Sequence, residues 1–423
     1  MRITLSVRPG LISAAAFLSM SAGTAMASNA DFQSFFTDLC AGTGIPTGDL
    51  ATRCAETGNG SGDGDLSGDS ESSLNPSQTL SSNDVALAAA RSRSQETRER
   101  GERLREGESA LGDGAASQSF GRLSLLAHAR GEWFETDRPD GGDPERGYDG
   151  DLWAIEFGLD YRATDRFVIG GILTYEEMDS DFDRDLQQGT PFVPASDAGS
   201  MEADSWGITL FGVYNVTDSF YVDAAAGYRS SDYTFERSSV FQESGRSSQI
   251  PVLTEGEPDG DEWWGSLNLG YDWQRGAWSF GPYGGITYAT SDIDSYLEKD
   301  QNGSGLNMRV DDTDRDSVLT HLGFRASYAI STGSGVWVPQ FRAEWNYDFD
   351  NDPLDVDTTY ALDTAQTLYP LEGNDPDDDY FNLGLGLVGI LPNGWIPFID
   401  GEILLGYEDF DRYRLTGGLR KEF

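Results

Sequence analysis

Residues 151–175 read DLWAIEFGLDYRATDRFVIGGILTY, and this stretch decides how the chain folds. In its first half every second side chain is apolar, from Trp153 to Tyr161, and charged residues occupy several of the positions between them. A repeat of two residues is that of a β-strand, whose side chains alternate between two faces. The short turn ATD at 163–165 separates this strand from a second apolar run that begins at Phe167. The stretch therefore predicts two antiparallel strands joined by a tight turn.

Aromatic residues begin and end the apolar face of six strands, eight or more positions apart. Alternation alone would also suit a soluble β-sandwich, whose apolar face is turned inward. Aromatic residues at both ends of an apolar face are instead typical of a strand that crosses a bilayer, where they lie at the two interfaces. The pairs are Trp153 and Tyr161, Trp206 and Tyr214, Trp263 and Tyr271, Trp278 and Tyr288, Trp337 and Tyr347, and Trp395 and Tyr407.

In all, we predict twelve strands, six of them with these aromatic pairs, and the count is even, as in single-chain bacterial outer-membrane barrels. Short turns alternate with long loops rich in Asp, Gly and Pro, which assigns the turns to the periplasm and the loops to the cell exterior. The predicted fold is all-β, a twelve-stranded antiparallel transmembrane barrel of the outer membrane. The predicted strands are approximately 121–134, 151–162, 167–177, 203–215, 220–234, 262–273, 278–289, 317–330, 335–347, 380–391, 395–407 and 412–423.

Composition narrows the class of protein. The 423 residues include 72 acidic and 29 basic side chains, for a formal net charge of −43. Such a surface excludes a nucleic-acid-binding protein, because phosphate backbones repel it. Only Lys299 and Lys421 are lysines, so no lysine-rich patch exists to hold anionic lipids. Beyond the N-terminus no run of 18 apolar residues occurs, which excludes a helical membrane protein.

Residues 1–27 predict a signal peptide. Two arginines precede the apolar run 11–20, and small residues lead up to Ala27, after which we place the cleavage. The mature chain is therefore expected to be exported through the general secretory pathway.

Residues 28–81 are expected to form a short passenger or linker. Cys40 and Cys54 predict a disulfide, since exported chains meet an oxidising compartment and no second pair of metal ligands lies nearby. From Thr57 the composition turns to Gly, Ser and Asp, which is typical of a flexible linker. With so few apolar residues the segment is not expected to build a sizeable core.

Two short motifs in this segment bear on chemistry. Acidic residues from Asp63 onward match the first positions of an EF-hand loop, but Leu74 stands where the bidentate carboxylate is required. Gly68-Asp69-Ser70 resembles the start of a GDS-type esterase motif, yet neither histidine of the chain lies in the segment. We therefore expect no calcium site, no cofactor and no catalytic residue here.

Residues 82–119 predict a helix and its connection to the barrel. Ser82-Asn83-Asp84 provides an N-cap, and Arg91, Arg98 and Arg105 then fall along one line of the helix. Two interpretations remain open: a solvated spacer helix, or a helix inside the barrel lumen that plugs the pore. In the second, its arginines would face the carboxylates of a wall that also carries inward arginines. The lumen-facing residues predicted by register are Glu156, Asp160, Glu176, Asp223, Asp272, Glu344, Asp400, Glu402, Arg162, Arg229, Arg325, Arg342, Arg414 and Arg420.

Four stretches, 151–175, 205–228, 280–298 and the closing LTGGLRKEF at 415–423, together resemble the autotransporter (type V secretion) translocator barrel of Gram-negative bacteria. The resemblance covers 120–423. It implies an outer-membrane location, a helix in the lumen and an N-terminal passenger carried to the cell surface. It also implies that Phe423 is the signal read by the barrel assembly machinery, after escort by periplasmic chaperones to a lipid and lipopolysaccharide environment. The passenger is much shorter than is usual for this family.

Two other functions remain open. Dense carboxylates in the long loops, as at 179–185, 311–316 and 375–379, suit an adhesin or a porin-like barrel that binds divalent cations. A hydrolase embedded in the barrel would need a histidine beside a serine or a carboxylate. His128 and His321 are predicted to face inward on different strands, with Ser124 and Ser327 on the same faces. We expect the protein to be a monomer that is not an enzyme and binds no cofactor.

Overall fold

A computed structural model describes residues 29–66, 70–80, 95, 122–136, 146–185, 192–243, 247–350, 353–373, 377–407 and 410–423. The predicted signal peptide and the arginines Arg91, Arg98 and Arg105 lie outside these residues. Within the described part of the chain, no helix is both long enough and apolar enough to span a bilayer.

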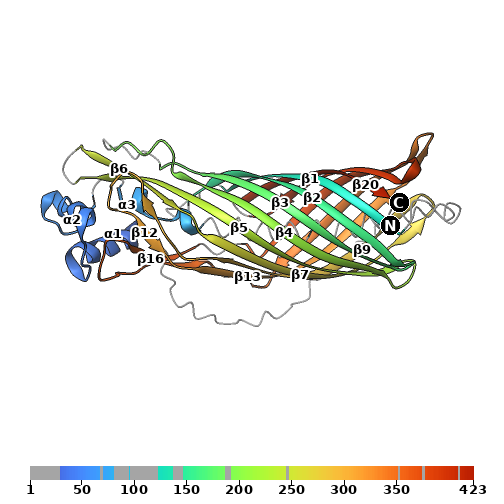
Figure 1. Ribbon diagram of the computed structural model, residues 1–423, viewed down its shortest axis with the longest axis horizontal. Helices are drawn as coiled ribbons and strands as arrows, with labels where there is room; N and C mark the ends of the chain where they lie inside the picture. The colour runs from blue at the N-terminus through green and yellow to red at the C-terminus, as the bar shows by residue number, and fades with distance from the viewer. Residues whose placement is uncertain are drawn as a thin grey trace, which may run out of the picture.

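Twelve antiparallel strands close into a barrel, as the alternation predicts (Figure 1). Each strand pairs with the next in the chain, and the last pairs with the first over residues 410–422 and 124–136, so the barrel leaves no open edge along its wall. The barrel strands are β1 (Leu123–Thr136), β2 (Tyr148–Thr164), β3 (Phe167–Phe182), β4 (Gly199–Asn215), β5 (Phe220–Gln242), β7 (Asp259–Tyr271), β9 (Trp278–Ile293), β13 (Thr313–Tyr328), β15 (Gly335–Asp348), β18 (Asp379–Ile390), β19 (Trp395–Leu405) and β20 (Phe410–Glu422).

The two faces of the wall separate as the register predicts. Apolar side chains on the outside remain exposed, among them Phe157 at 61% and Leu385 at 68%, which suits contact with lipid tails. Most of the predicted outer aromatics lie on this face. Tyr407 does not: it lies beyond the end of β19 and packs against Tyr380 and Phe410, because the chain has already left the ladder there.

Strands at the long-loop end continue beyond the barrel. β5 was expected to end near residue 234 but runs to Gln242, where β6 (Gln249–Gly256) turns back along it. Four short strands from two loops form a separate sheet, which we call the loop sheet: β10 (Tyr296–Leu297), β12 (Met308–Val310), β16 (Asp355–Tyr360) and β17 (Tyr369–Glu372). The remaining short strands are β8 (Trp273–Arg275), β11 (Lys299–Asp300) and β14 (Ile330–Thr332), and the turn η3 (Pro392–Gly394) precedes β19.

The N-terminal segment packs against these loops, and we call its described residues 29–66 and 70–80 the cap. It lies at the end of the barrel opposite the C-terminus (Figure 1). Instead of the flexible linker expected after Thr57, the structure has short helices and turns in its described residues 58–66 and 70–80. Its elements are α1 (Asn29–Thr37), η1 (Asp38–Gly42), α2 (Gly48–Ala55), η2 (Gly58–Gly60) and α3 (Ser70–Leu74).

The cap and the loops share one apolar core, so the cap needs no sizeable core of its own. The cap supplies its phenylalanines and leucines, and the loop sheet and the β5–β6 hairpin supply the opposing side. The core contains Phe32, Phe35, Phe36, Leu39, Leu50, Leu74, Leu80, Phe241, Val252, Leu306, Met308, Val310, Leu354, Val356, Tyr360, Tyr369 and Leu371.

Candidate functional site

A chain of ion pairs crosses the lumen side of β1, β3, β5 and β7. Arg130 contacts Glu132 at 3.3 Å and Glu176 at 2.5 Å. Arg229 contacts the other oxygen of Glu176 at 3.0 Å and reaches Glu262 at 2.9 Å. All five side chains are buried, and a buried charge is tolerated only when it is paired and hydrogen-bonded. The alternating charges therefore tie four strands of the wall together.

Small residues on the strands between make these contacts possible. Ala154 on β2 stands in register between Arg130 and Glu176, so the arginine reaches across β2 without obstruction. Ser205 on β4 is opposite Glu176, and its hydroxyl accepts a 3.1 Å hydrogen bond from Arg229. Alternating long charged and small side chains around the wall thus lets pairs form across an intervening strand.

On the other side of the barrel, glycines likewise leave room for an ion pair to form across an intervening strand. Arg342 on β15 forms two hydrogen bonds of 2.9 Å with Asp400 on β19, over the intervening β18. An added Cβ at Gly384 would lie 2.5 Å from Nη2 of Arg342, and one at Gly386 would lie 2.6 Å from Oδ2 of Asp400. The two glycines of β18 therefore leave the space in which this pair forms.

Glu402 is the centre of a second cluster in the lumen. Arg342, Arg412 and Arg414 lie 3.4, 3.4 and 3.2 Å from its carboxylate oxygens. Gln95 donates a hydrogen bond from Nε2 to the same carboxylate, and its Oε1 accepts one of 3.3 Å from Asn382 on β18. Gln95 belongs to the segment between the cap and β1, and it is buried against the barrel wall. The sequence carried no signal for this neutral side chain among its charged neighbours.

The inward-facing charges predicted by register are found on the lumen side. The eight carboxylates and six arginines named from the sequence all lie on that face, and Arg325 pairs with Asp272 at 2.7 Å. The two histidines also face inward, but they do not meet. His128 contacts Glu156 at 3.1 Å, whereas the ring of His321 lies 6.2 Å from that of Tyr283. The lumen charges thus pair mainly with each other.

Ser70, Ser124 and Ser327 are the serines considered for hydrolytic chemistry; Ser327 is buried on β13, and the other two accept hydrogen bonds. Ser124 accepts a 2.9 Å hydrogen bond from Arg420. Ser70 is fully buried, and its Oγ accepts a 2.6 Å hydrogen bond from the backbone N–H of Gln242 on β5. A nucleophile needs an exposed hydroxyl beside a base. Both hydroxyls instead have structural partners.

The cap contacts the loop sheet through stacked aromatic rings. Phe35 stacks on Tyr369 with centroids 4.9 Å apart and on Tyr360 at 5.9 Å. Phe32 meets Tyr369 edge-on at 5.4 Å, and Phe36 meets Tyr360 edge-on at 5.9 Å. Burial raises the pKa of both tyrosines above its usual value. Aromatic pairs of this geometry add about 0.5–1.5 kcal/mol each beyond the area that they bury.

A backbone ladder joins the middle of the cap to the loop after β16. The N–H of Thr47 donates to the carbonyl of Leu362 at 2.9 Å, and the N–H of Thr364 donates to that of Ile45 at 3.1 Å. Oδ1 of Asp363 accepts the N–H of Ile45 at 2.7 Å, and Oδ2 accepts that of Thr367 at 2.7 Å. Burial alone would raise the pKa of Asp363, but these hydrogen bonds outweigh it and hold the pKa below its usual value.

The loops contain a buried ion pair that the sequence did not reveal. Arg237, on the extension of β5, forms hydrogen bonds of 2.9 and 2.6 Å with the two oxygens of Glu298. It also donates to the carbonyl of Leu306, while Glu298 accepts the N–H of Met308 at 2.7 Å. Burial acts to lower the pKa of Arg237, and the charge of Glu298 more than compensates and raises it. The pair fixes β5 against the segment leading to β12.

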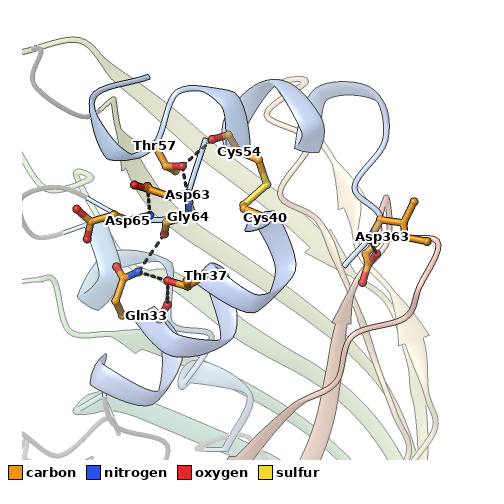
Figure 2. The surroundings of a disulfide bond; sticks show 10 residues. Gln33, Thr37, Cys40, Cys54, Thr57, Asp63, Gly64, Asp65 and Asp363 are labelled. Carbon is orange, nitrogen blue, oxygen red and sulfur yellow. Dashed lines mark hydrogen bonds between the residues drawn. A yellow bond between two sulfur atoms is a disulfide. The ribbon is translucent and has the colours of Figure 1, made fainter. Parts of the chain in front are cut away.

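The predicted disulfide is present, and Cys40 and Cys54 join η1 to α2 (Figure 2). Thr57 extends the link: its hydroxyl donates to the carbonyl of Cys54 at 2.6 Å and accepts the N–H of Gly64 at 2.8 Å. The carbonyl of Gly64 in turn accepts from Gln33 at 2.9 Å. The disulfide and these hydrogen bonds hold the turns of the cap against α1.

The stretch that resembles an EF-hand loop has local contacts instead. Asp63 accepts hydrogen bonds from the hydroxyl of Ser61 at 2.7 Å and the N–H of Asp65 at 3.1 Å, which lower its pKa. Leu74 is buried in the shared core. Among the residues that the structure describes, no group of three or more His, Cys, Asp or Glu side chains is arranged to hold a metal ion.

Phe423 lies at the short-turn end of the seam between β20 and β1. Its N–H donates to the carbonyl of Leu123 at 3.0 Å, and its ring is exposed. The ammonium of Lys421 lies 5.2 Å from the centre of this ring and 5.3 Å from that of Trp395. The terminal aromatic is therefore accessible from the outside of the barrel.

Comparison with known proteins agrees with this architecture. The model of the autotransporter beta-domain family matches residues 126–402. Esterase EstA of Pseudomonas aeruginosa is 24% identical over 239 residues, which cover 47% of this chain and 36% of that protein. Esterase EstA of Pseudomonas putida matches to the same extent. The chain thus spans about a third of the length of these curated relatives.

A solved structure shows the same fold. The translocator domain of the autotransporter NalP from Neisseria meningitidis superposes with a TM-score of 0.53 at 14% identity, covering 78% of this chain and 98% of that domain. The beta domain of the Bordetella autotransporter BrkA has a TM-score of 0.47 at 16% identity, covering 72% and 100%. The family match extends over more than half of the chain, so this protein belongs to the autotransporter beta-domain family, and its barrel lies in the Gram-negative outer membrane.

Proposed function

We propose that the barrel exports its own N-terminal segment, residues 28–81, and keeps it as a folded cap on the cell surface. The observation that carries this proposal is the core that the cap shares with the long loops, at the barrel end opposite the C-terminus. The short turns mark the periplasmic end, so the cap is assigned to the outside. The segment acts as a short passenger that stays attached.

The same proposal gives residues 82–119 the part of a pore plug. Support comes from Gln95, which is buried and hydrogen-bonded to Glu402 and Asn382 on the lumen wall. A chain that leaves the cap and reaches Leu123 at the periplasmic end must traverse the barrel. Arg91, Arg98 and Arg105, within the same segment, then face a wall that already pairs its charges. The barrel is a closed pore in its resting state.

Exposure of the cap on intact cells tests the export proposal. An epitope inserted at Gly60 would report on the cap, since an added Cβ there meets nothing within 4 Å. Gly276, in a short turn, has equally open surroundings and provides the matched control. Antibody should bind the Gly60 epitope on intact cells, and the Gly276 epitope only after permeabilisation. An epitope at Gly60 that is detected only after permeabilisation would refute export.

We also propose that the protein is not an enzyme. Its curated relatives are named as esterases, but the match covers about a third of their length. The buried, hydrogen-bonded hydroxyl of Ser70 favours a structural part for the serine of the esterase-like motif. In the presence of purified protein, p-nitrophenyl butyrate should be hydrolysed no faster than in buffer alone, and Ser70→Ala should leave that rate unchanged. Hydrolysis that disappears in Ser70→Ala would contradict this.

For assembly, we propose that Phe423 is the residue read by the barrel assembly machinery, after delivery by periplasmic chaperones. Its exposed ring at the end of β20 supports this. Phe423→Ala should lower the amount of folded barrel in the outer membrane, whereas Phe157→Ala, which removes an exposed ring from the middle of β2, should leave it nearly unchanged. Equal yields from the two variants would refute the assignment.

A further inference from the structure

Within the described part of the chain, the cap covers an apolar surface of the long loops. The loop sheet turns Val310, Val356 and Leu371 toward the cap, and each is at most 2% exposed. Their partners across the interface are α1 and α3, through side chains such as Phe32 and Leu74. Without the cap, this face of the loop sheet would lie open to water, which is unfavourable in proportion to its apolar area.

The loops also present an open strand edge. β4 begins at Gly199, opposite Arg237, while β5 continues to Gln242 with β6 along one side. On the other side, the N–H groups that its last residues turn away from β6 have no strand beside them. Ser73 accepts the N–H of Val240 at 2.9 Å, and Ser70 accepts that of Gln242 at 2.6 Å. A buried backbone N–H must find an acceptor. Two serines one helical turn apart on α3 supply it.

A third feature of the loops is an acceptor for extended backbone. Asp363 and the carbonyl of Leu362 receive N–H groups from Ile45 and Thr47 of the cap. The strand edge belongs to the β5–β6 hairpin, whereas the backbone acceptor lies between β16 and β17 of the loop sheet, and the cap contacts all three features. Such complementarity is that of a binding site and its ligand.

The cap itself is too small to fold stably alone. Chains of this length bury little of their surface without disulfides or a partner. Its apolar side chains pack mainly outward against the loops, and the rings of Phe35 and Phe36 meet Tyr360 and Tyr369. The disulfide closes only one short loop of the segment. Emergence from the pore would therefore give the segment no stable structure until it meets the loops.

We propose that the extracellular loops are a receptor for the emerging cap, and that capture by this receptor makes its export one-way. A segment that can slide through the pore in either direction stays outside when it can bind only there. The fraction retained outside is set by the ratio of bound to unbound segment. This inference rests on the proposed export of the cap, and it names the contact between cap and loops as what favours export over return. Contacts with the extracellular loops, and not with the lumen wall, then keep the cap outside the cell.

Two leucine-to-aspartate variants in one loop test the proposal. Leu371→Asp places a charge in the shared core, whereas Leu368→Asp changes a residue that is 58% exposed. Both are made in the chain with the Gly60 epitope, in cells. Antibody binding to intact cells should fall at least tenfold for Leu371→Asp and stay at the parent level for Leu368→Asp. Barrel assembly is measured in parallel from the heat-modifiable band of the folded barrel.

A parent-level epitope signal in Leu371→Asp would overturn the proposal, because the cap would then reach and keep the surface without its receptor. If Leu371→Asp prevents barrel assembly, Phe32→Asp replaces it as the test variant, since that substitution leaves every loop residue in place. A tenfold loss in Phe32→Asp supports capture, and an unchanged signal refutes it. Absence of the epitope from intact parent cells would refute export itself, which separates the two failures.

Discussion

Replacing Gly384 with alanine should uncouple the ion pair that crosses β18. The added Cβ would lie 2.5 Å from Nη2 and 2.8 Å from Cζ of Arg342. Because this guanidinium ends a flexible side chain, it should swing away while the strand stays in place. The swing breaks both 2.9 Å hydrogen bonds to Asp400. Both charges remain and can be rehydrated, so we expect a loss of about 1.5–3 kcal/mol in unfolding free energy, the range for charge-assisted hydrogen bonds.

Gly401→Ala on β19 is the matched control. Its added Cβ would meet nothing nearer than 3.9 Å, so it reports the backbone effect of glycine-to-alanine alone. The assay is urea unfolding of the purified barrel in detergent, followed by loss of the heat-modifiable band. Gly384→Ala should unfold at lower urea than Gly401→Ala, and the difference should vanish when Arg342→Ala is added to both. Equal midpoints for the two glycine variants in the parent chain would refute the reasoning.

Three further results are expected. Replacing Cys40 and Cys54 by serine should destabilise the cap by about 3 kcal/mol, the value expected for a disulfide that closes a loop of this length. The loss is measured as faster proteolysis of the cap on folded barrels. Unchanged proteolysis would contradict the expectation. Deleting residues 83–107 should raise single-channel conductance in planar bilayers, and an unchanged conductance would argue against the plug. The pKa of Asp363, in the loop that binds the cap, is below its usual value of 3.8 in the folded protein. Its contribution to the stability of the docked cap is therefore complete above that pH and is lost as pH falls through the folded-state pKa. Proteolysis of the cap should therefore accelerate below pH 3.8, and Asp363→Asn should remove that dependence; a pH dependence that persists in the variant would sink the assignment.

The barrel could be predicted because its signal is local. A side chain's face is set by strict alternation, so Glu176, Arg229 and Asp400 could be placed on the lumen side from the register alone. Twelve strands followed from the same repeat. Most of the predicted ends are short at the long-loop side, whereas β19 stops there at Leu405, before its predicted end. There the strands leave the bilayer, and the pattern that lipid imposes on the outer face ends. The extension of β5 through FERSSVFQ at 235–242 therefore had no period to reveal it.

The cap could not be predicted because its partners are distant in sequence. Phe35 finds Tyr360 and Tyr369 more than 300 positions away, and its own segment reads as polar and acidic. Composition measures what a segment can bury alone, and it is silent about a core shared with loops. Gln95 and the Arg237–Glu298 pair were missed for a related reason: single polar residues carry no period. The glycines of β18 were a readable signal, since Gly384 and Gly386 occupy inward positions beside the charged residues Arg342 and Asp400.

We propose that the N-terminal segment is docked on the extracellular loops in living cells. A photo-crosslinking amino acid in place of Phe35 tests this directly, because that ring lies 4.9 Å from Tyr369 and 5.9 Å from Tyr360. After irradiation of intact cells, mass spectrometry should find the crosslink to peptides that contain Tyr360 or Tyr369. Crosslinks to periplasmic proteins in place of these peptides would contradict the account.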